Sequence, residues 1–208
     1  MPPRKGTQRY VYGSVDVVVP LGAVQRLPLP QQAAVVASVF AALAACVAAA
    51  VSLLLPALDA AAPDAMAACR AAWPLWGLAY AFAGVMHFVA ADAFRACMPK
   101  RGAWGFWYVP GSAWFHVAWS GVLEAVVGAA LAAGALPAAR AAAPELVPRC
   151  AAVLLVHTTA VSFANIYMYS HNAPTPMVGT MTPAAHAGRF ALQAWLLTVE
   201  WELMHGRF

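Results

Sequence analysis

The sequence predicts an all-α membrane protein, with a four-helix antiparallel transmembrane bundle and one extra N-terminal transmembrane helix in front of it. Hydrophobic residues make up 63% of the 208 residues and charged residues only 10%, far from the roughly 45–50% and 25% of soluble globular domains. Several apolar segments also approach the roughly 20 residues that span a membrane. These segments are residues 32–57, 71–92, 113–136, 150–169 and 186–204.

The segments divide the chain into three parts. Residues 1–31 form a basic N-terminal segment, residues 32–57 form the extra helix, and residues 71–204 form the bundle. The extra helix is mostly alanine, which gains little free energy from leaving water. Pro56 and Pro110 stand where a span ends or a loop runs, because a missing amide donor matters least there.

The cations are distributed unequally between the two faces that five spans would create. One face would receive Arg4, Lys5, Arg9, Arg26, Arg95, Lys100, Arg101 and Arg189, and the other Arg70, Arg140, Arg149 and Arg207. The positive-inside rule then places the N-terminus on the cytoplasm-equivalent side of a bacterial inner membrane or of an organellar membrane, thylakoid or inner mitochondrial. No basic patch is interleaved with base-stacking aromatic residues, so nucleic acid is not an expected partner.

Each of the last four segments carries a stripe of polar residues at helical spacing. The stripes are Tyr80/Gly84/His87, His116/Ser120/Glu124, Thr158/Ser162/Asn165/Tyr169 and Arg189/Gln193/Glu200. Because polar groups are expensive in hydrocarbon, the stripes should turn toward one another. A rise of about 1.5 Å per residue puts their central members at similar depth. The sequence therefore predicts one hydrogen-bonded cluster inside the bundle.

The same stripes carry a family resemblance. The blocks are Gly84-Val-Met-His87-Phe88, Ser120-Gly121-Val-Leu-Glu124, Phe163-Ala164-Asn165-Ile166-Tyr167-Met168 and Arg189-Phe-Ala-Leu-Gln193. Their order and spacing resemble the DoxX-like membrane proteins over about residues 71–204. The resemblance implies a four-helix antiparallel bundle. It also implies an association with membrane redox assemblies, since the family is named for a small subunit linked to thiosulfate:quinone oxidation.

Five residues of the stripes are the candidates for ligand binding or proton handling: His87, Glu124, Asn165, Arg189 and Gln193. A carboxylate beside a histidine suits proton transfer. The alternative is that these groups only form interhelical hydrogen bonds that fix which helices are neighbours. Arg189 either extends to the membrane surface or pairs with Glu124.

Other polar residues have simpler interpretations. His157 lies about 100° from the stripe of its own helix, so it is predicted to face lipid or a partner subunit. Glu200 and Glu202 are predicted to reach the headgroups of the opposite leaflet. A haem or chlorophyll-type ring held by His87 and His116 is disfavoured, because axial ligation requires facing histidines.

The cysteines and the aromatic loop leave alternatives open. The chain has no Cys-x-x-Cys pair, so no metal site is expected from its thiols. Cys69 and Cys150 fall on the same predicted side, where a disulfide would form only if that side is oxidising; inert thiols are the favoured reading. The aromatic residues between 104 and 114 fit a membrane interface, with a stacking site for a flat ligand as the alternative.

The sequence shows no Ser/His/Asp arrangement and no phosphate-binding loop, so we do not expect an independent enzyme. It favours an accessory or structural subunit of a larger respiratory or photosynthetic membrane complex, with other membrane subunits and lipids as partners. The alternatives are a quinone-linked redox subunit and a bundle that binds lipid or another apolar ligand. Quinone and lipid are the cofactors considered, and a tetrapyrrole is disfavoured.

Overall fold

The computed structural model describes residues 5–175 and 179–207, so Arg4 of the basic segment lies outside the described residues. The described chain begins with an antiparallel hairpin of β1 (Thr7–Tyr12) and β2 (Val15–Pro20). The register pairs Thr7 with Pro20 and Tyr12 with Val15. Gly13 occupies the turn with φ +58°, a conformation that glycine adopts without strain.

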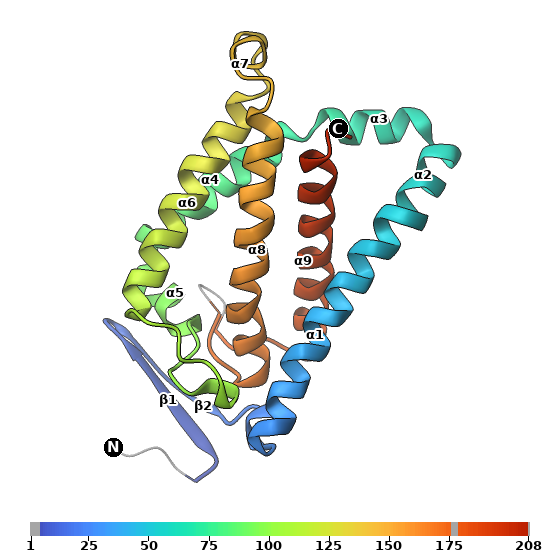
Figure 1. The fold of residues 1–208 in the computed structure, drawn as a ribbon. Coiled ribbons are helices and arrows are strands. Elements are labelled where there is room, and N and C mark those ends of the chain that lie inside the picture. The colour runs from blue at the N-terminus through green and yellow to red at the C-terminus, as the bar shows by residue number, and fades with distance from the viewer. Residues whose placement is uncertain (1–4, 176–178, 208) are drawn as a thin grey trace.

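The rest of the described chain is mostly helical. The elements are the 3₁₀ turn Val24–Arg26, α1 (Leu29–Ala49), the π-helical segment Ala50–Leu54, α2 (Leu55–Ala61), α3 (Pro63–Ala71), α4 (Pro74–Val89), α5 (Ala91–Cys97), the 3₁₀ turn Ala103–Gly105, α6 (Ala113–Ala133), α7 (Pro137–Ala142), α8 (Leu146–Ser170) and α9 (Pro183–Met204). Figure 1 shows the long helices running between two ends of the molecule. We call them the hairpin end, with β1 and β2, and the α7 end, with α3 and the last turn of α9.

Four helical stretches are long and apolar enough to cross a membrane: Leu29–Ala61, Pro63–Val89, Ala113–Ala133 and Leu146–Ser170. The fifth predicted span forms α9, which has sufficient length but is less apolar than the others. Its composition is the reason, because α9 includes His186, Arg189, Gln193 and Glu200. The apolar helices are compatible with an integral membrane protein.

Two predicted spans differ from the helices that form. The helix predicted over residues 71–92 is interrupted, since α3 ends at Ala71, α4 begins at Pro74 and α4 ends at Val89. The first span is longer than predicted, because its helix continues past Pro56 to Ala61 through the π-helical segment. Pro56 therefore does not end this span. A π-turn just before a proline can absorb the amide donor that the proline lacks.

Helices α4 and α6 pack closely through glycines. A Cβ atom at Gly84 would lie 2.3 Å from the backbone nitrogen of Ala125, and one at Gly121 would lie 2.6 Å from the Cβ of His87. Gly77 and Gly128 repeat this contact two turns away, at 2.5 Å from backbone nitrogens of the facing helix. No side chain fits at these positions, so the helices approach backbone to backbone.

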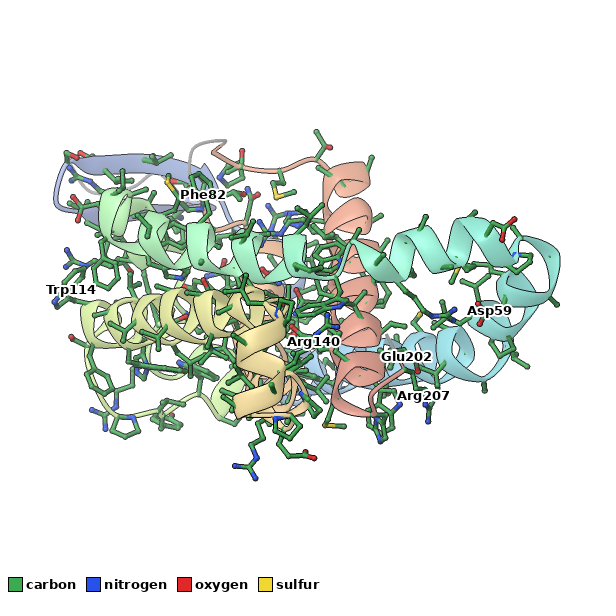
Figure 2. The ribbon with its side chains drawn as sticks, turned by 90° about the horizontal axis from the view of Figure 1, so that it is seen from above. Asp59, Phe82, Trp114, Arg140, Glu202 and Arg207 are labelled. Atoms are coloured by element: carbon green, nitrogen blue, oxygen red, sulfur yellow. The ribbon has the colours of Figure 1, made fainter. Side chains whose placement is uncertain are left out.

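Helix α1 stands partly apart from the other long helices. It packs against α8 and α9 near the hairpin end, and then diverges from α9 toward the α7 end (Figures 1 and 2). Helix α3 connects this diverging arm to α4, and Arg70 of α3 holds α2 through Asp59 at 2.5 Å and 2.6 Å. The divergence leaves space between α1 and the α8/α9 pair.

The hairpin, which belongs to the basic N-terminal segment, packs against the last turns of α8. Tyr10 of β1 is 0% exposed and packs edge-on against Tyr167 of α8. Trp104, 1% exposed, joins the same core and donates from Nε1 to the Ser170 hydroxyl at 2.9 Å. The prediction of a membrane-interface aromatic belt is therefore wrong for Trp104, although Tyr108 and Trp114 are exposed.

Candidate functional site

The first polar cluster surrounds Glu124 of α6, which is only 6% exposed. Because α4 and α6 are in backbone contact, His87 of α4 comes within reach: its Nδ1 lies 3.3 Å from Glu124 Oε2. His157 of α8 approaches from the other side, with Nε2 at 2.9 Å from Glu124 Oε1. Ser120, one turn before Glu124 on α6, lies 3.3 Å from the same His157 nitrogen.

His157 is the clearest correction to the sequence prediction. It was expected to face lipid or a partner, but it is 2% exposed and contacts Glu124. The stripe on α8 was assigned to one face only, whereas α8 packs between α6 and α9 and so buries two faces. A helix with neighbours on both sides carries polar contacts on both sides.

The second polar cluster surrounds Glu200 of α9, which is 2% exposed. Its Oε1 accepts a hydrogen bond from the Thr158 hydroxyl at 2.6 Å and another from the Tyr80 hydroxyl. The prediction that Glu200 reaches the headgroups is therefore wrong. Glu202 is also buried and pairs with Arg207 at 3.0 Å near the C-terminus, where Figure 2 shows the two side by side.

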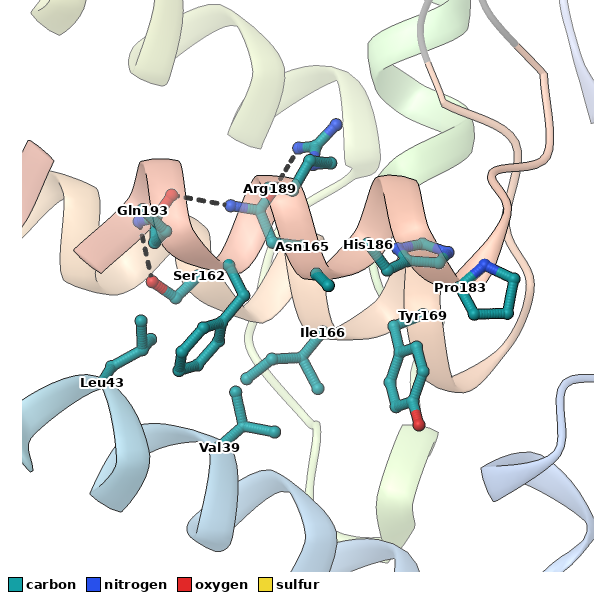
Figure 3. A pocket seen from close by; sticks show the side chains of 12 residues that line it. Val39, Leu43, Ser162, Asn165, Ile166, Tyr169, Pro183, His186, Arg189 and Gln193 are labelled. Atoms are coloured by element: carbon teal, nitrogen blue, oxygen red, sulfur yellow. Dashed lines mark hydrogen bonds between the residues drawn. The ribbon is translucent and has the colours of Figure 1, made fainter. Parts of the chain in front are cut away.

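The third polar cluster joins α8 to α9 through two amide side chains. Asn165 Nδ2 donates to Gln193 Oε1 at 2.9 Å, and Arg189 donates to Asn165 Oδ1. Gln193 Nε2 donates to the Ser162 hydroxyl at 3.0 Å (Figure 3). Arg189 thus bonds a neutral amide, and among the described ion pairs Glu124 has only histidine partners.

Thr158 joins two of the three clusters. Its carbonyl oxygen accepts from Gln193 Nε2 at 2.8 Å, while its hydroxyl donates to Glu200. The Glu124 cluster adjoins this network through His157, the preceding residue on α8. The predicted single cluster therefore forms in two parts: Asn165, Arg189 and Gln193 belong to one, and His87 and Glu124 to the other.

His116 and the cysteines lie outside these clusters. Since tryptophan only donates, His116 Nδ1 accepts from Trp119 at 3.2 Å, and His116 Nε2 lies 2.9 Å from the Pro110 carbonyl, to which it donates. Both ring nitrogens are thus occupied. Cys69 is exposed and Cys150 is buried, and both are free thiols. Within the described ranges no group of three His, Cys, Asp or Glu residues is placed to hold a metal ion.

An apolar cleft lies between α1 and the α8/α9 pair. One cavity of about 400 Å³ is bounded by Val39 and Leu43 of α1, Ile166 of α8 and Phe190 of α9. A second cavity of about 720 Å³ continues along α1 toward the α7 end, and Leu43 and Ser162 line both. We call the two cavities together the α1 cleft.

The polar residues at the α1 cleft lie on one side of it. In Figure 3 the side chains of Val39 and Leu43 face Ile166, whereas the Arg189 guanidinium points away from α1. Asn165 and Gln193 line the cavity next to Arg189 but satisfy each other by hydrogen bonding. The α1 cleft is therefore an apolar channel with a hydrogen-bonded polar margin.

These features define a class: a helical protein whose long apolar helices enclose buried polar clusters and border an apolar cleft. The chain belongs to the family of the domain of unknown function DUF8561, whose model matches residues 76–204. That stretch runs from α4 to α9 and leaves out the hairpin and α1. No curated protein and no solved structure matches the chain. The family has no assigned function, so the resemblance to DoxX-like proteins stays a prediction.

Proposed function

We propose that this protein is an integral membrane protein that binds an apolar or amphipathic small molecule, a lipid or a quinone, in the α1 cleft. The observation that carries the proposal is the pair of adjoining cavities lined by Leu43 and Ser162. Their volumes of about 400 and 720 Å³ are in the usual range for ligand sites. Their lining suits a hydrocarbon or isoprenoid chain.

The proposal includes a transmembrane arrangement. Helices α4, α6, α8 and α9 would form the antiparallel bundle that the DoxX-like resemblance implies, and α1 would be the extra transmembrane helix. α9 would cross the membrane despite its polar residues, because Gln193 and Glu200 are buried against neighbouring helices. The hairpin end would lie on the cytoplasm-equivalent side, since Lys100 and Arg101 are found there.

Substitution of Leu43 tests ligand binding. Leu43 is 3% exposed and borders both cavities, so the larger side chain of Leu43→Trp would occupy space in the α1 cleft. Leu53→Trp is the matched control, because Leu53 is 70% exposed on the same helical stretch and lines neither cavity. Both variants would be purified gently from membranes alongside the wild type.

Mass spectrometry of the molecules that co-purify gives the readout. We expect the wild type and Leu53→Trp to retain a lipid or quinone, and Leu43→Trp to retain about tenfold less of it, as a tenfold loss of affinity gives when the ligand is not saturating. Adding back a short-chain quinone or a single-chain lipid distinguishes the two ligand classes. If all three proteins retain the same molecules in equal amount, the α1 cleft is not a ligand site.

The role of an accessory or structural subunit is a second candidate. The outer faces of α4 and α6 are apolar, with Phe82 67% and Val126 62% exposed, which suits contact with lipid and with other membrane subunits equally. Isolation in mild detergent tests this role. An accessory subunit would migrate in a larger assembly, whereas an independent ligand-binding protein would migrate alone.

A further inference from the structure

Three polar side-chain atoms that can accept hydrogen bonds are buried between the helices. Glu124 Oε2, His157 Nδ1 and Glu200 Oε2 are buried and have no hydrogen-bond partner among the described residues. Unpaired polar atoms in an apolar interior are costly, and each is normally satisfied. Two of these atoms, Glu124 Oε2 and His157 Nδ1, belong to the same cluster.

The tautomer of His87 follows from its neighbours. Its Nδ1 lies 2.9 Å from the Ala83 carbonyl oxygen, which only accepts, so Nδ1 carries the hydrogen and donates to that oxygen. The same nitrogen is 3.3 Å from Glu124 Oε2, which thus lies next to an N–H that is already engaged. This arrangement explains why Oε2 lacks a full hydrogen bond although it lies beside a histidine.

The charge of the cluster is not balanced by any basic side chain. Arg189 donates to Asn165, and in the described part of the chain no Lys or Arg is paired with Glu124. With both histidines neutral, the cluster carries one net negative charge inside apolar helices. Such a charge is expensive unless it is neutralised. A proton bound by the cluster would compensate this charge.

Residues from four other helices face Glu124 or its histidine partners. Facing the cluster are His87 and Tyr80 from α4, Ser120 from α6 and His157 from α8, and Phe94 of α5 stacks on His87 at 4.1 Å. From α9, the carboxyl group of Glu200 interacts electrostatically with Glu124. None of these groups is a permanent cation, so the neighbours of Glu124 do not compensate its charge.

We propose that His87, Glu124 and His157 together form a site that binds one exchangeable proton. Uptake forms one O–H bond on Glu124 and makes the cluster neutral; release breaks that bond and restores the single negative charge. His157 Nε2 carries the ring hydrogen and donates it to Glu124 Oε1 across their 2.9 Å contact, so the added proton binds to the other carboxylate oxygen, Oε2. No electron transfer is involved.

His87 provides the entry to the site. An imidazole that receives a proton on Nε2 can pass its Nδ1 proton to an acceptor on the other side of the ring. Glu124 Oε2, 3.3 Å from Nδ1 and without a partner, is that acceptor. His87, 9% exposed, is more accessible than His157, 2% exposed, so the proton enters at His87 and is held on Glu124.

Infrared difference spectroscopy of the full chain in lipid vesicles tests this site. Spectra are recorded while the pH is lowered and raised over the range in which the protein stays folded. In the wild type we expect a reversible carbonyl band from one protonated carboxyl group. Glu124→Gln should lose the band completely, and Glu202→Gln, which removes the carboxylate paired with Arg207, should retain it.

Two outcomes would overturn the proposal. One is the absence of any reversible carboxyl band in the wild type; the other is a band that persists in Glu124→Gln and disappears in Glu200→Gln. If Glu124→Gln does not fold, nitrogen NMR of labelled histidines in the wild type decides. Two imidazoles should shift together with the carboxyl band, and unchanged imidazole signals would refute a shared proton. None of the three residues lines the α1 cleft, so ligand binding is tested separately.

Discussion

Thr158 and Glu200 join α8 to α9 through a buried hydrogen bond of 2.6 Å between the threonine hydroxyl and the carboxylate. The next residue, Thr159, has the same side chain but is exposed, and its hydroxyl donates to the Leu155 carbonyl of its own helix at 2.8 Å. One threonine hydroxyl therefore links two helices, and its neighbour bonds only within its own helix. The two positions form a matched pair for substitution.

Thr158→Val should destabilise the protein by about 1–3 kcal/mol, because it removes a donor to a buried carboxylate while keeping the shape of the side chain. Thr159→Val should stay within about 0.5 kcal/mol of the wild type. Reversible unfolding in mixed detergent micelles, monitored by tryptophan fluorescence, measures both. Equal effects of the two changes would refute the interior position of Thr158.

Gly84→Ala should weaken the contact between α4 and α6. The added Cβ would lie 2.3 Å from the Ala125 backbone nitrogen, so the helices would have to separate, at about 1–3 kcal/mol. Gly188→Ala on α9 is the control, because a Cβ there meets nothing within 4 Å. Thermal denaturation should show a lower midpoint for Gly84→Ala than for the wild type, and no such decrease for Gly188→Ala. A Gly84→Ala midpoint equal to that of the wild type would contradict the close approach of α4 and α6.

His171 should make stability depend on pH at the hairpin end. Ser170 accepts from Trp104 and therefore donates its hydroxyl to His171 Nδ1 at 2.9 Å, which requires a neutral ring. Burial, together with the nearby Lys100 charge, lowers the pKa of His171 to about 4. The unfolded chain, with a His pKa of about 6.5, binds more protons between these values, so this contribution is complete above about pH 6.5 and is lost as the pH falls toward 4.

The thermal midpoint of the wild type, measured at intervals across that range, should therefore fall with decreasing pH. His171→Gln should lose most of this dependence, because glutamine does not titrate. A wild-type midpoint that rises on acidification, or an unchanged slope in His171→Gln, would contradict the buried neutral ring.

Tyr10 should anchor the hairpin. The side chain is fully buried, its hydroxyl lies 3.3 Å from the His171 carbonyl oxygen, and Lys100 Nζ lies 4.5 Å from the ring centroid. Tyr10→Ala should cost about 3–5 kcal/mol and release the hairpin to proteases. Tyr108→Ala, at a position 60% exposed, should leave cleavage of the hairpin at its wild-type rate. Equal cleavage of the two variants would show that the hairpin is not docked.

The helices could be predicted because apolar composition and length dominate their formation. The predicted segment 113–136 became α6 (Ala113–Ala133), and 150–169 became α8 (Leu146–Ser170). The hairpin was missed, although Tyr10-Val-Tyr-Gly-Ser-Val-Asp-Val alternates around a Gly-Ser turn, a recognised hairpin pattern. Charge alone identifies residues 1–31 as a basic segment and does not indicate strands.

The polar interior could be predicted only in part. Helical spacing predicts that Asn165 and Gln193 lie together and that His87 lies near Glu124, and both contacts are present. It could not show that α8 lies between two helices, so His157 was assigned to the outside. Nor could it show that Glu200 lies opposite Tyr80 and Thr158, because depth along a helix does not reveal which neighbour a side chain meets.

The most direct test of membrane insertion is spin-label accessibility in lipid vesicles. Labels would be attached to Val126→Cys on α6 and Val156→Cys on α8, where the native residues are 62% and 71% exposed, after the exposed Cys46 and Cys69 are replaced by serine. If these faces contact lipid, both labels will collide readily with dissolved oxygen and rarely with a water-soluble nickel chelate. Free access of the chelate to either label would place that face in water and contradict a transmembrane protein.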